Sequence, residues 1–310
     1  PDCVVNYEEI DVMADDWLDS DDEIATTAPS DPVAHWKFEN NLNDQVTAIA
    51  GTPSGDTGGP TYVDGYDNKA LSFSAATSDY VTIPDVTGRT EFDTESFSIG
   101  IWIKSSSMTG KEFILCNGSN SSEWADASGK RYVLKLENNT EIRFLVDDDN
   151  RGGPPTGDKD VVVGARADYA TGDWVHVMIV RDTIAGQLRL YRNGILDNTN
   201  DNHDAYEIAS PGEPLFIGGK YEEDAGAATQ AEAPIAHFFT GQVDDLRIYS
   251  YALSDSEVAN VTTMGLPELY VPLASPGEIY EGEDEGDRVI NFKDYAELMK
   301  NWLAEMKYPQ

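Results

Sequence analysis

Five consecutive residues in the first third of the chain have the types and spacing for hydrolytic chemistry. Glu91, Asp93 and Glu95 stand at positions i, i+2 and i+4 of the segment Glu91-Phe92-Asp93-Thr94-Glu95. On a β-strand, alternate side chains share a face, so a strand here would gather three carboxylates. Two carboxylates at short separation can serve as nucleophile and acid/base in retaining glycoside hydrolysis. The segment lacks the apolar alternation of a strand, so we predict that it is not a catalytic strand and that the protein is not an enzyme. A glycan hydrolase that uses Glu91 and Glu95 is the weakest alternative.

A repeat at the two ends of the chain indicates an assembly device. Residues 5–18 and 290–303 align in one register, in which Asn6, Trp17 and Leu18 recur as Asn291, Trp302 and Leu303. In each copy the large apolar residues fall at the spacing of one face of an α-helix. They are Tyr7, Ile10, Met13 and Trp17 in the first copy and Phe292, Tyr295, Met299 and Trp302 in the second. Because a short helix is not stable alone, each copy must pack on the rest of the chain, on its twin or on a neighbouring molecule.

The charge of the chain limits its partners. Of 310 residues, 57 are acidic and 21 basic, which gives a formal net charge of −36. Such a field repels nucleic acids and anionic membranes and attracts divalent cations, above all calcium. The sequence has no apolar run long enough to span a bilayer, and we expect a soluble, secreted protein without membrane insertion. Its two cysteines, Cys3 and Cys116, allow at most one disulfide.

The middle of the chain is predicted to be all-β. Short apolar or alternating runs are separated by Gly, Pro, Asn and Asp turns. The predicted strands cover residues 35–38, 70–73, 80–83, 97–103, 111–115, 132–136, 141–146, 174–180, 187–192, 215–217 and 242–249. Asn193-Gly194 predicts a two-residue hairpin, and Ser254 predicts the N-cap of a short helix. We divide the chain into a terminal repeat (1–20), an acidic linker (21–32), a β domain (33–264), a Pro-, Gly- and Glu-rich linker (265–286) and a second repeat (287–310).

Several sequence blocks carry a resemblance to a known family. They include Asp79-Tyr80-Val81-Thr82-Ile83-Pro84, Leu190-Tyr191-Arg192-Asn193-Gly194 and Gly241-Gln242-Val243-Asp244-Asp245-Leu246-Arg247-Ile248-Tyr249. In this order the blocks resemble the laminin-G-like, concanavalin A-like jelly-roll domain, over about three quarters of the chain. The resemblance implies an all-β, two-sheet jelly roll, a fold shared by lectins, protein-binding modules and glycanases.

The same resemblance implies a calcium ion on the outer side of one sheet. The matching carboxylates are Glu39 and Asp44, after the first strand, and Asp245 in the last. The alternative is that Asp244 and Asp245 are solvated edge residues. Trp124, in the turn-rich segment 117–130, could stack on a sugar or anchor its loop.

Three other tryptophans and two histidines are predicted to be structural. Trp36, Trp102 and Trp174 lie within apolar strands and are predicted to pack in the core. His35 and His176 are predicted to be satisfied, half-buried side chains.

The terminal repeats resemble the calcium-loop-plus-helix halves of dockerin modules, of the type found in planctomycete-like bacteria. In the second copy the resemblance implies calcium ligands at Asp287, Asn291 and Asp294, although Arg288 replaces the usual turn glycine. The first and last strands of the resembling family are neighbours, so the two halves could meet. The alternative is that each helix only caps the sandwich.

These patterns predict a secreted, non-catalytic protein that binds an extracellular glycan or matrix protein, with short α-helical dockerin-like segments at both termini for docking. The alternative function is a structural subunit that assembles into an extracellular filament or matrix as a homo-oligomer, through pairing of the terminal repeats between molecules.

Overall fold

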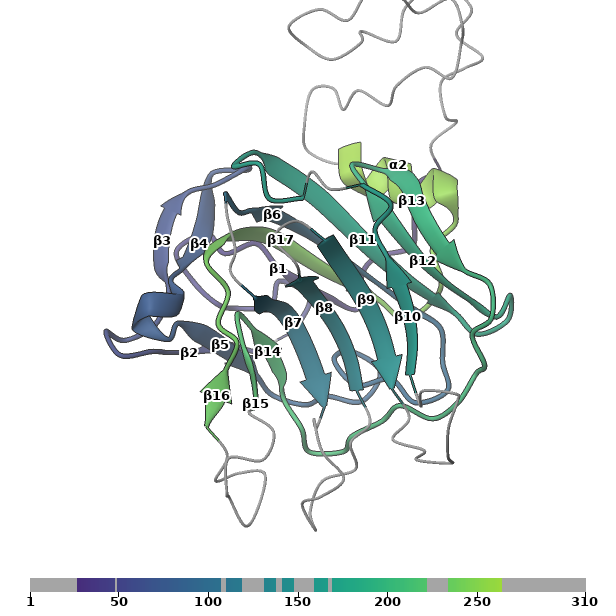
Figure 1. The fold of residues 1–310 in the computed structure, drawn as a ribbon, viewed down its shortest axis with the longest axis horizontal. Helices are drawn as coiled ribbons and strands as arrows, with labels where there is room; N and C mark the ends of the chain where they lie inside the picture. Colours follow the sequence, from purple (N-terminus) through teal and green to yellow (C-terminus); the bar gives the residue numbers. More distant parts are fainter. Residues whose placement is uncertain are drawn as a thin grey trace, which may run out of the picture.

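The computed structural model describes residues 27–47, 49–106, 110–118, 131–137, 141–147, 159–166, 169–221 and 234–263. Both terminal repeats, Trp124 and Cys3 lie outside these residues. The two main elements are large β-sheets packed face to face, and Figure 1 shows the sheet that contains β7, β8, β9 and β10 in front of the other. The all-β, two-sheet prediction is confirmed.

The eight-stranded sheet has the order β13-β12-β11-β6-β17-β4-β3, with β1 also paired to β17. Its strands are β1 (Ala34–Trp36), β3 (Thr61–Asp64), β4 (Lys69–Phe73), β6 (Phe97–Lys104), β11 (Trp174–Asp182), β12 (Gln187–Arg192), β13 (Ile195–Asn200) and β17 (Gly241–Tyr249).

The seven-stranded sheet has the order β10-β9-β8-β7-β14-β5-β2. Its strands are β2 (Thr52–Ser54), β5 (Tyr80–Ile83), β7 (Lys111–Gly118), β8 (Arg131–Glu137), β9 (Glu141–Asp147), β10 (Lys159–Val163) and β14 (Leu215–Ile217). A small ribbon joins β15 (Lys220–Tyr221) to β16 (Ile235–Ala236), and η1 (Ala75–Thr77) is a short 3-10 helix.

The core between the sheets follows from the period of two along each strand. In β6, Phe97, Ile99, Ile101 and Ile103 point inward and are fully buried. Trp36 joins the same cluster at 0% exposure, which confirms its predicted place in the core. Each large apolar side chain buried in this way stabilises the fold by about 1.5–3 kcal/mol.

The predicted turns and the closing helix are present. Asn193 and Gly194 both have positive φ, 49° and 83°, as a type I′ hairpin turn requires. Helix α2 (Asp255–Thr263) begins with a capping box, in which the backbone N–H of Ser254 donates to Glu257 Oε2 at 2.8 Å and that of Glu257 donates to Ser254 Oγ at 3.4 Å. The first predicted strand is shorter than expected, because Phe38 takes a φ of 57° and leaves the sheet.

Helix α2 also marks where the described chain enters and leaves the sandwich. The backbone N–H of Thr27 donates to the carbonyl of Ser256, 3.2 Å away, and α2 ends at Thr263. At 1.5 Å per residue, Ser256 and Thr263 are only about 10 Å apart. Strands β1 and β17 are antiparallel neighbours, as predicted, so the two terminal repeats are attached at nearby points.

Candidate functional site

The acidic triplet lies in a turn before β6 and not on a strand. Glu91 is buried at 5% exposure, whereas Glu95 is exposed and its Oε2 accepts the backbone N–H of Asp93 at 2.9 Å. Burial, with Asp85 nearby, raises the pKa of Glu91. A catalytic role would require the three carboxylates to share one open face. They do not share one.

The carboxylates implied for calcium have other partners. Asp44 is buried at 4% exposure and accepts the backbone N–H groups of His35 at 2.7 Å and Val46 at 3.0 Å. Glu39 Oε2 accepts the N–H of Lys69 at 3.2 Å. In the part of the chain that the structure describes, no group of three or more His, Cys, Asp or Glu side chains is placed to hold a metal.

Asp245 is paired with an imidazole and a guanidinium of the protein. Its Oδ1 lies 2.5 Å from His35 Nε2, and its Oδ2 lies 2.8 Å from Arg247 Nη2. Burial alone would raise the pKa of Asp245, but the His35 hydrogen bond and the Arg247 charge hold it below its usual value. Glu39, Asp44 and Asp245 each have protein partners in this arrangement, and calcium at this place stays a prediction from the family resemblance.

Asp244 is not the solvated edge residue of the alternative interpretation. It is 1% exposed, and its Oδ2 accepts the backbone N–H groups of Tyr66 at 2.9 Å and Asp67 at 3.0 Å. Burial raises its pKa to about 7. Asp244 therefore ties the turn between β3 and β4 to the outside of the eight-stranded sheet.

The predicted structural histidines are satisfied. His35 bonds to Asp245, as described above, and His176 Nδ1 lies 3.0 Å from Thr262 Oγ1. That hydroxyl donates to the carbonyl of Val258 at 2.8 Å. Thr262 has no second proton to give, so His176 Nδ1–H must be the donor of the other bond.

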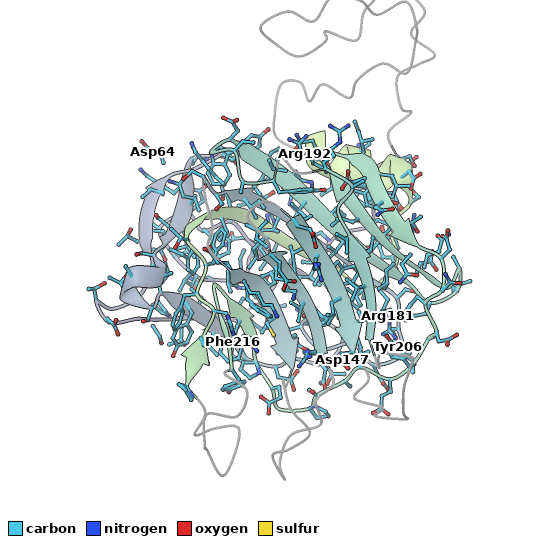
Figure 2. All side chains as sticks on the ribbon, in the orientation of Figure 1. Asp64, Asp147, Arg181, Arg192, Tyr206 and Phe216 are labelled. Atoms are coloured by element: carbon cyan, nitrogen blue, oxygen red, sulfur yellow. The ribbon has the colours of Figure 1, made fainter. Side chains whose placement is uncertain are left out.

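A row of aromatic side chains crosses the outer face of the seven-stranded sheet. Phe216 of β14 points outward because its neighbours Leu215 and Ile217 belong to the inter-sheet core. Figure 2 shows Phe216 next to the β15–β16 ribbon. Tyr80 of β5 lies beside it, with ring centroids 6.2 Å apart. Tyr221 of β15 meets Phe216 edge-on at 4.8 Å.

The row ends at Phe238, whose ring centroid lies 6.2 Å from that of Tyr80. Tyr80, Tyr221 and Phe238 are partly exposed. We call these four residues the aromatic face: Tyr80, Phe216, Tyr221 and Phe238.

Two lysines lie close to Phe113, on the strand next to β14, and both are buried, Lys135 at 9% and Lys220 at 5% exposure. Lys135 Nζ on β8 and Lys220 Nζ on β15 lie 5.7 and 5.2 Å from the ring centroid of Phe113 on β7. Burial lowers the pKa of Lys135, although Glu137 Oε2 lies only 2.9 Å from its Nζ. The partly exposed rings of Tyr80, Tyr221 and Phe238 thus offer flat apolar surface, which suits the C–H face of a sugar.

The structure does not describe Trp124, and it places two of the other tryptophans outside the inter-sheet core. Trp124 lies outside the described residues, in the segment that joins Gly118 at the end of β7 to Arg131 at the start of β8. Trp102 is buried at 4% exposure but points away from the inter-sheet core, and Trp174 is only partly buried. The prediction of packing in the inter-sheet core is thus right for Trp36. It is wrong for Trp102 and Trp174, which lie on the outer face of the eight-stranded sheet.

The two packed sheets define a jelly roll of the concanavalin A-like type. A model of the concanavalin A-like lectin/glucanases superfamily matches residues 74–259, more than half of the chain, and the protein belongs to this family. No curated protein matches the chain in sequence.

Solved structures of binding domains share the fold at low sequence identity. The binding domain of botulinum neurotoxin serotype G is similar at 13% identity and a TM-score of 0.55, covering 76% of this chain and 51% of that one. The serotype D ligand-binding domain, in complex with N-acetylneuraminic acid, matches at 17% and 0.54, over 82% and 53%.

A third similar structure is domain 4 of AbnA, an extracellular arabinanase of Geobacillus stearothermophilus, in complex with arabinotriose. It matches at 20% identity and a TM-score of 0.50, over 75% of this chain and 98% of that one. The chain therefore spans about half of the toxin domains and nearly all of the arabinanase domain.

Proposed function

We propose that the protein is a secreted, non-catalytic glycan-binding protein that holds carbohydrate on the aromatic face. The observation that carries this proposal is the row of four aromatic rings on one outer face, three of which are partly exposed. Two of the similar structures are complexes with carbohydrate, arabinotriose and N-acetylneuraminic acid. No helix among the described residues is long and apolar enough to cross a membrane. The proposed partner of the protein is an extracellular glycan or a glycan-bearing matrix protein.

Removing the two partly exposed tyrosines of the aromatic face tests this proposal. We expect Tyr80→Ala with Tyr221→Ala to weaken glycan binding by about 10- to 100-fold, since each aromatic contact contributes on the order of 1 kcal/mol. The measurement is isothermal titration with the glycan that the wild-type protein retains best from an array. Tyr62→Ala is a matched control, because Tyr62 is 37% exposed on β3 of the other sheet. Equal loss in the control, or none in the double variant, would contradict the proposed site.

The terminal repeats support a docking role for the two ends of the chain. Thr27 contacts α2 and Thr263 ends it, so both repeats are tethered to neighbouring points of the sandwich. Such tethering raises the effective concentration of one copy near the other. We therefore favour pairing within one molecule, as a split dockerin-like module with calcium ligands at Asp287, Asn291 and Asp294, over the self-assembling filament subunit.

A double-mutant cycle tests the pairing. We expect Trp17→Ala and Trp302→Ala to cause similar losses of stability, each on the order of 1.5–3 kcal/mol. The double variant should lose less than the sum, because both changes open one interface. The readouts are melting temperature and native mass. Pairing within a molecule lowers the melting temperature at constant mass, whereas dissociation of oligomers would favour the filament subunit. Strictly additive losses would show that the copies do not touch.

A further inference from the structure

A second aromatic cluster lies on the opposite side of the sandwich. On the outer face of the eight-stranded sheet, α2 covers one half, where Met178, Val180 and Tyr249 pack against Leu253 and Val258. The other half carries Trp102 of β6 and Trp174 of β11, whose strands are adjacent. On this second half the outer face is covered by the turn between β3 and β4 and not by α2.

Three rings form a corner there. Tyr66 stacks on Trp102, with centroids 3.4 Å apart and planes 21° apart. Trp174 stands at 61° to Tyr66, with centroids 6.1 Å apart. Trp102 is buried beneath Tyr66, whereas Tyr66 and Trp174 remain partly exposed. Tyr66 is thus the floor of the corner and Trp174 its wall.

The floor is held in place by a buried carboxylate. Asp244 accepts the backbone N–H groups of Tyr66 and Asp67, and the Gly65 N–H donates to the carbonyl of Asn68 at 2.9 Å. A Cβ at Gly65 would lie 2.6 Å from Asp244 Oδ2, so only glycine fits. This turn fixes the orientation of the Tyr66 ring before any ligand arrives, which reduces the ordering cost of binding.

The chemistry of the corner suits a neutral sugar ring. A pyranose presents a C–H face that can lie flat on one aromatic ring while its edge meets a second, and its hydroxyls need hydrogen-bond partners. Lys104 Nζ lies 5.9 Å from the Trp174 ring centroid, and Gln242 pairs with Lys104 across β6 and β17. Asp67 and Asp173 are exposed in the adjoining turns, and a chain with a net charge of −36 disfavours anionic glycans here.

We propose that Tyr66 and Trp174 form a second carbohydrate site, for a neutral pyranose unit, on the sheet opposite the aromatic face. Two sites on opposite faces let one molecule bridge two polysaccharide chains, or bind one matrix with avidity. This inference extends the proposed function, because it assigns binding to residues outside the aromatic face.

The two sites can be separated by experiment. The probes are cellohexaose, xylohexaose and mannohexaose, each titrated calorimetrically into the full chain. In the Tyr80→Ala/Tyr221→Ala background we expect residual binding of at least one probe. Adding Trp174→Ala should weaken it about tenfold, the equivalent of one aromatic contact. Tyr66→Phe should preserve binding, because it keeps the ring and removes only the hydroxyl. Trp174 is partly exposed, so its replacement is expected to leave the fold intact, with a melting curve as the check.

The outcomes separate this inference from the proposed function. Binding that the Tyr80→Ala/Tyr221→Ala variant abolishes would overturn the second site and leave the aromatic face in place. Residual binding that Trp174→Ala does not weaken would also overturn it. So would a Trp174→Ala variant that changes in native mass but not in sugar binding, because that result would show that another protein molecule covers the corner. Absence of binding of these probes by the wild type would overturn the inference, and absence on the full glycan array would overturn the proposed function as well.

Discussion

The Arg181→Met variant is expected to lose on the order of 3–5 kcal/mol of its free energy of unfolding, because Arg181 is a fully buried cation with several partners. Its Nη1 donates to the carbonyl of Asp93 at 2.6 Å, its Nη2 donates to the carbonyl of Tyr206, and its Nε donates to His203 Nε2 at 2.9 Å. Figure 2 shows Arg181 and Tyr206 next to each other at the side of the sandwich.

The protonation of His203 follows from these contacts. Since Nε2 accepts from Arg181, Nδ1 must carry the proton and donate to Asp160 Oδ2, 2.7 Å away. Methionine would fill much of the space but would remove these three hydrogen bonds from the protein interior.

Denaturant unfolding measures the loss. Arg166→Met is the matched control, because the Arg166 side chain is 54% exposed and its Nε lies 3.7 Å from the carboxylate of Asp197. We expect the control to change stability by less than about 1 kcal/mol. Similar losses in both variants would show that Arg181 does not organise the turn that contains the acidic triplet.

The second large effect is a pair of opposing pH dependences. Burial lowers the pKa of His176 from 6.5 to about 3. Below pH 6.5 the unfolded chain therefore takes up a proton that the folded protein excludes, so stability falls as the pH drops from about 6.5 towards 3. Burial raises the pKa of Asp244 from 3.8 to about 7. The folded protein there retains a proton that the unfolded chain has lost, so stability falls as the pH rises from about 4 to 7.

Between about pH 4 and 6.5 the two slopes cancel, each being about 1.4 kcal/mol per pH unit for one proton. We expect His176→Asn to expose the Asp244 slope, so that its stability falls with rising pH. Asp244→Asn should show the reverse, with stability that rises with pH. Unfolding free energies at half-unit pH steps measure both. Two variants with the wild-type slope would refute the assignment of these protons to His176 and Asp244.

The sequence predicts the central strands well, because apolar alternation and flanking turns mark them. Strands β2, β3, β10 and β13 were not predicted, and in β3 and β13 Thr61-Tyr62-Val63-Asp64 and the polar residues after Leu196 lack that alternation. All four strands lie at the ends of their sheets, where one side has no neighbouring strand to favour apolar residues.

The candidate sites were harder to predict than the strands. In runs such as Phe113-Ile114-Leu115 and Leu215-Phe216-Ile217 every residue is apolar, so the sequence does not tell which side chain faces outward. The only local signal for the aromatic corner is an aromatic residue inside a turn, Gly65-Tyr66-Asp67-Asn68. The burial of Asp244 depends on N–H groups about 180 positions earlier in the chain, which no local pattern reports.

One measurement tests the central claim of glycan binding without catalysis most directly. The wild type and a Glu91→Gln/Glu95→Gln variant are incubated with an array of plant, microbial and animal glycans, and retained protein and released reducing ends are measured together. We predict that both proteins are retained equally on the same glycans and that neither releases reducing ends. Release by the wild type that the variant loses, or retention of neither protein on any glycan, would contradict the account.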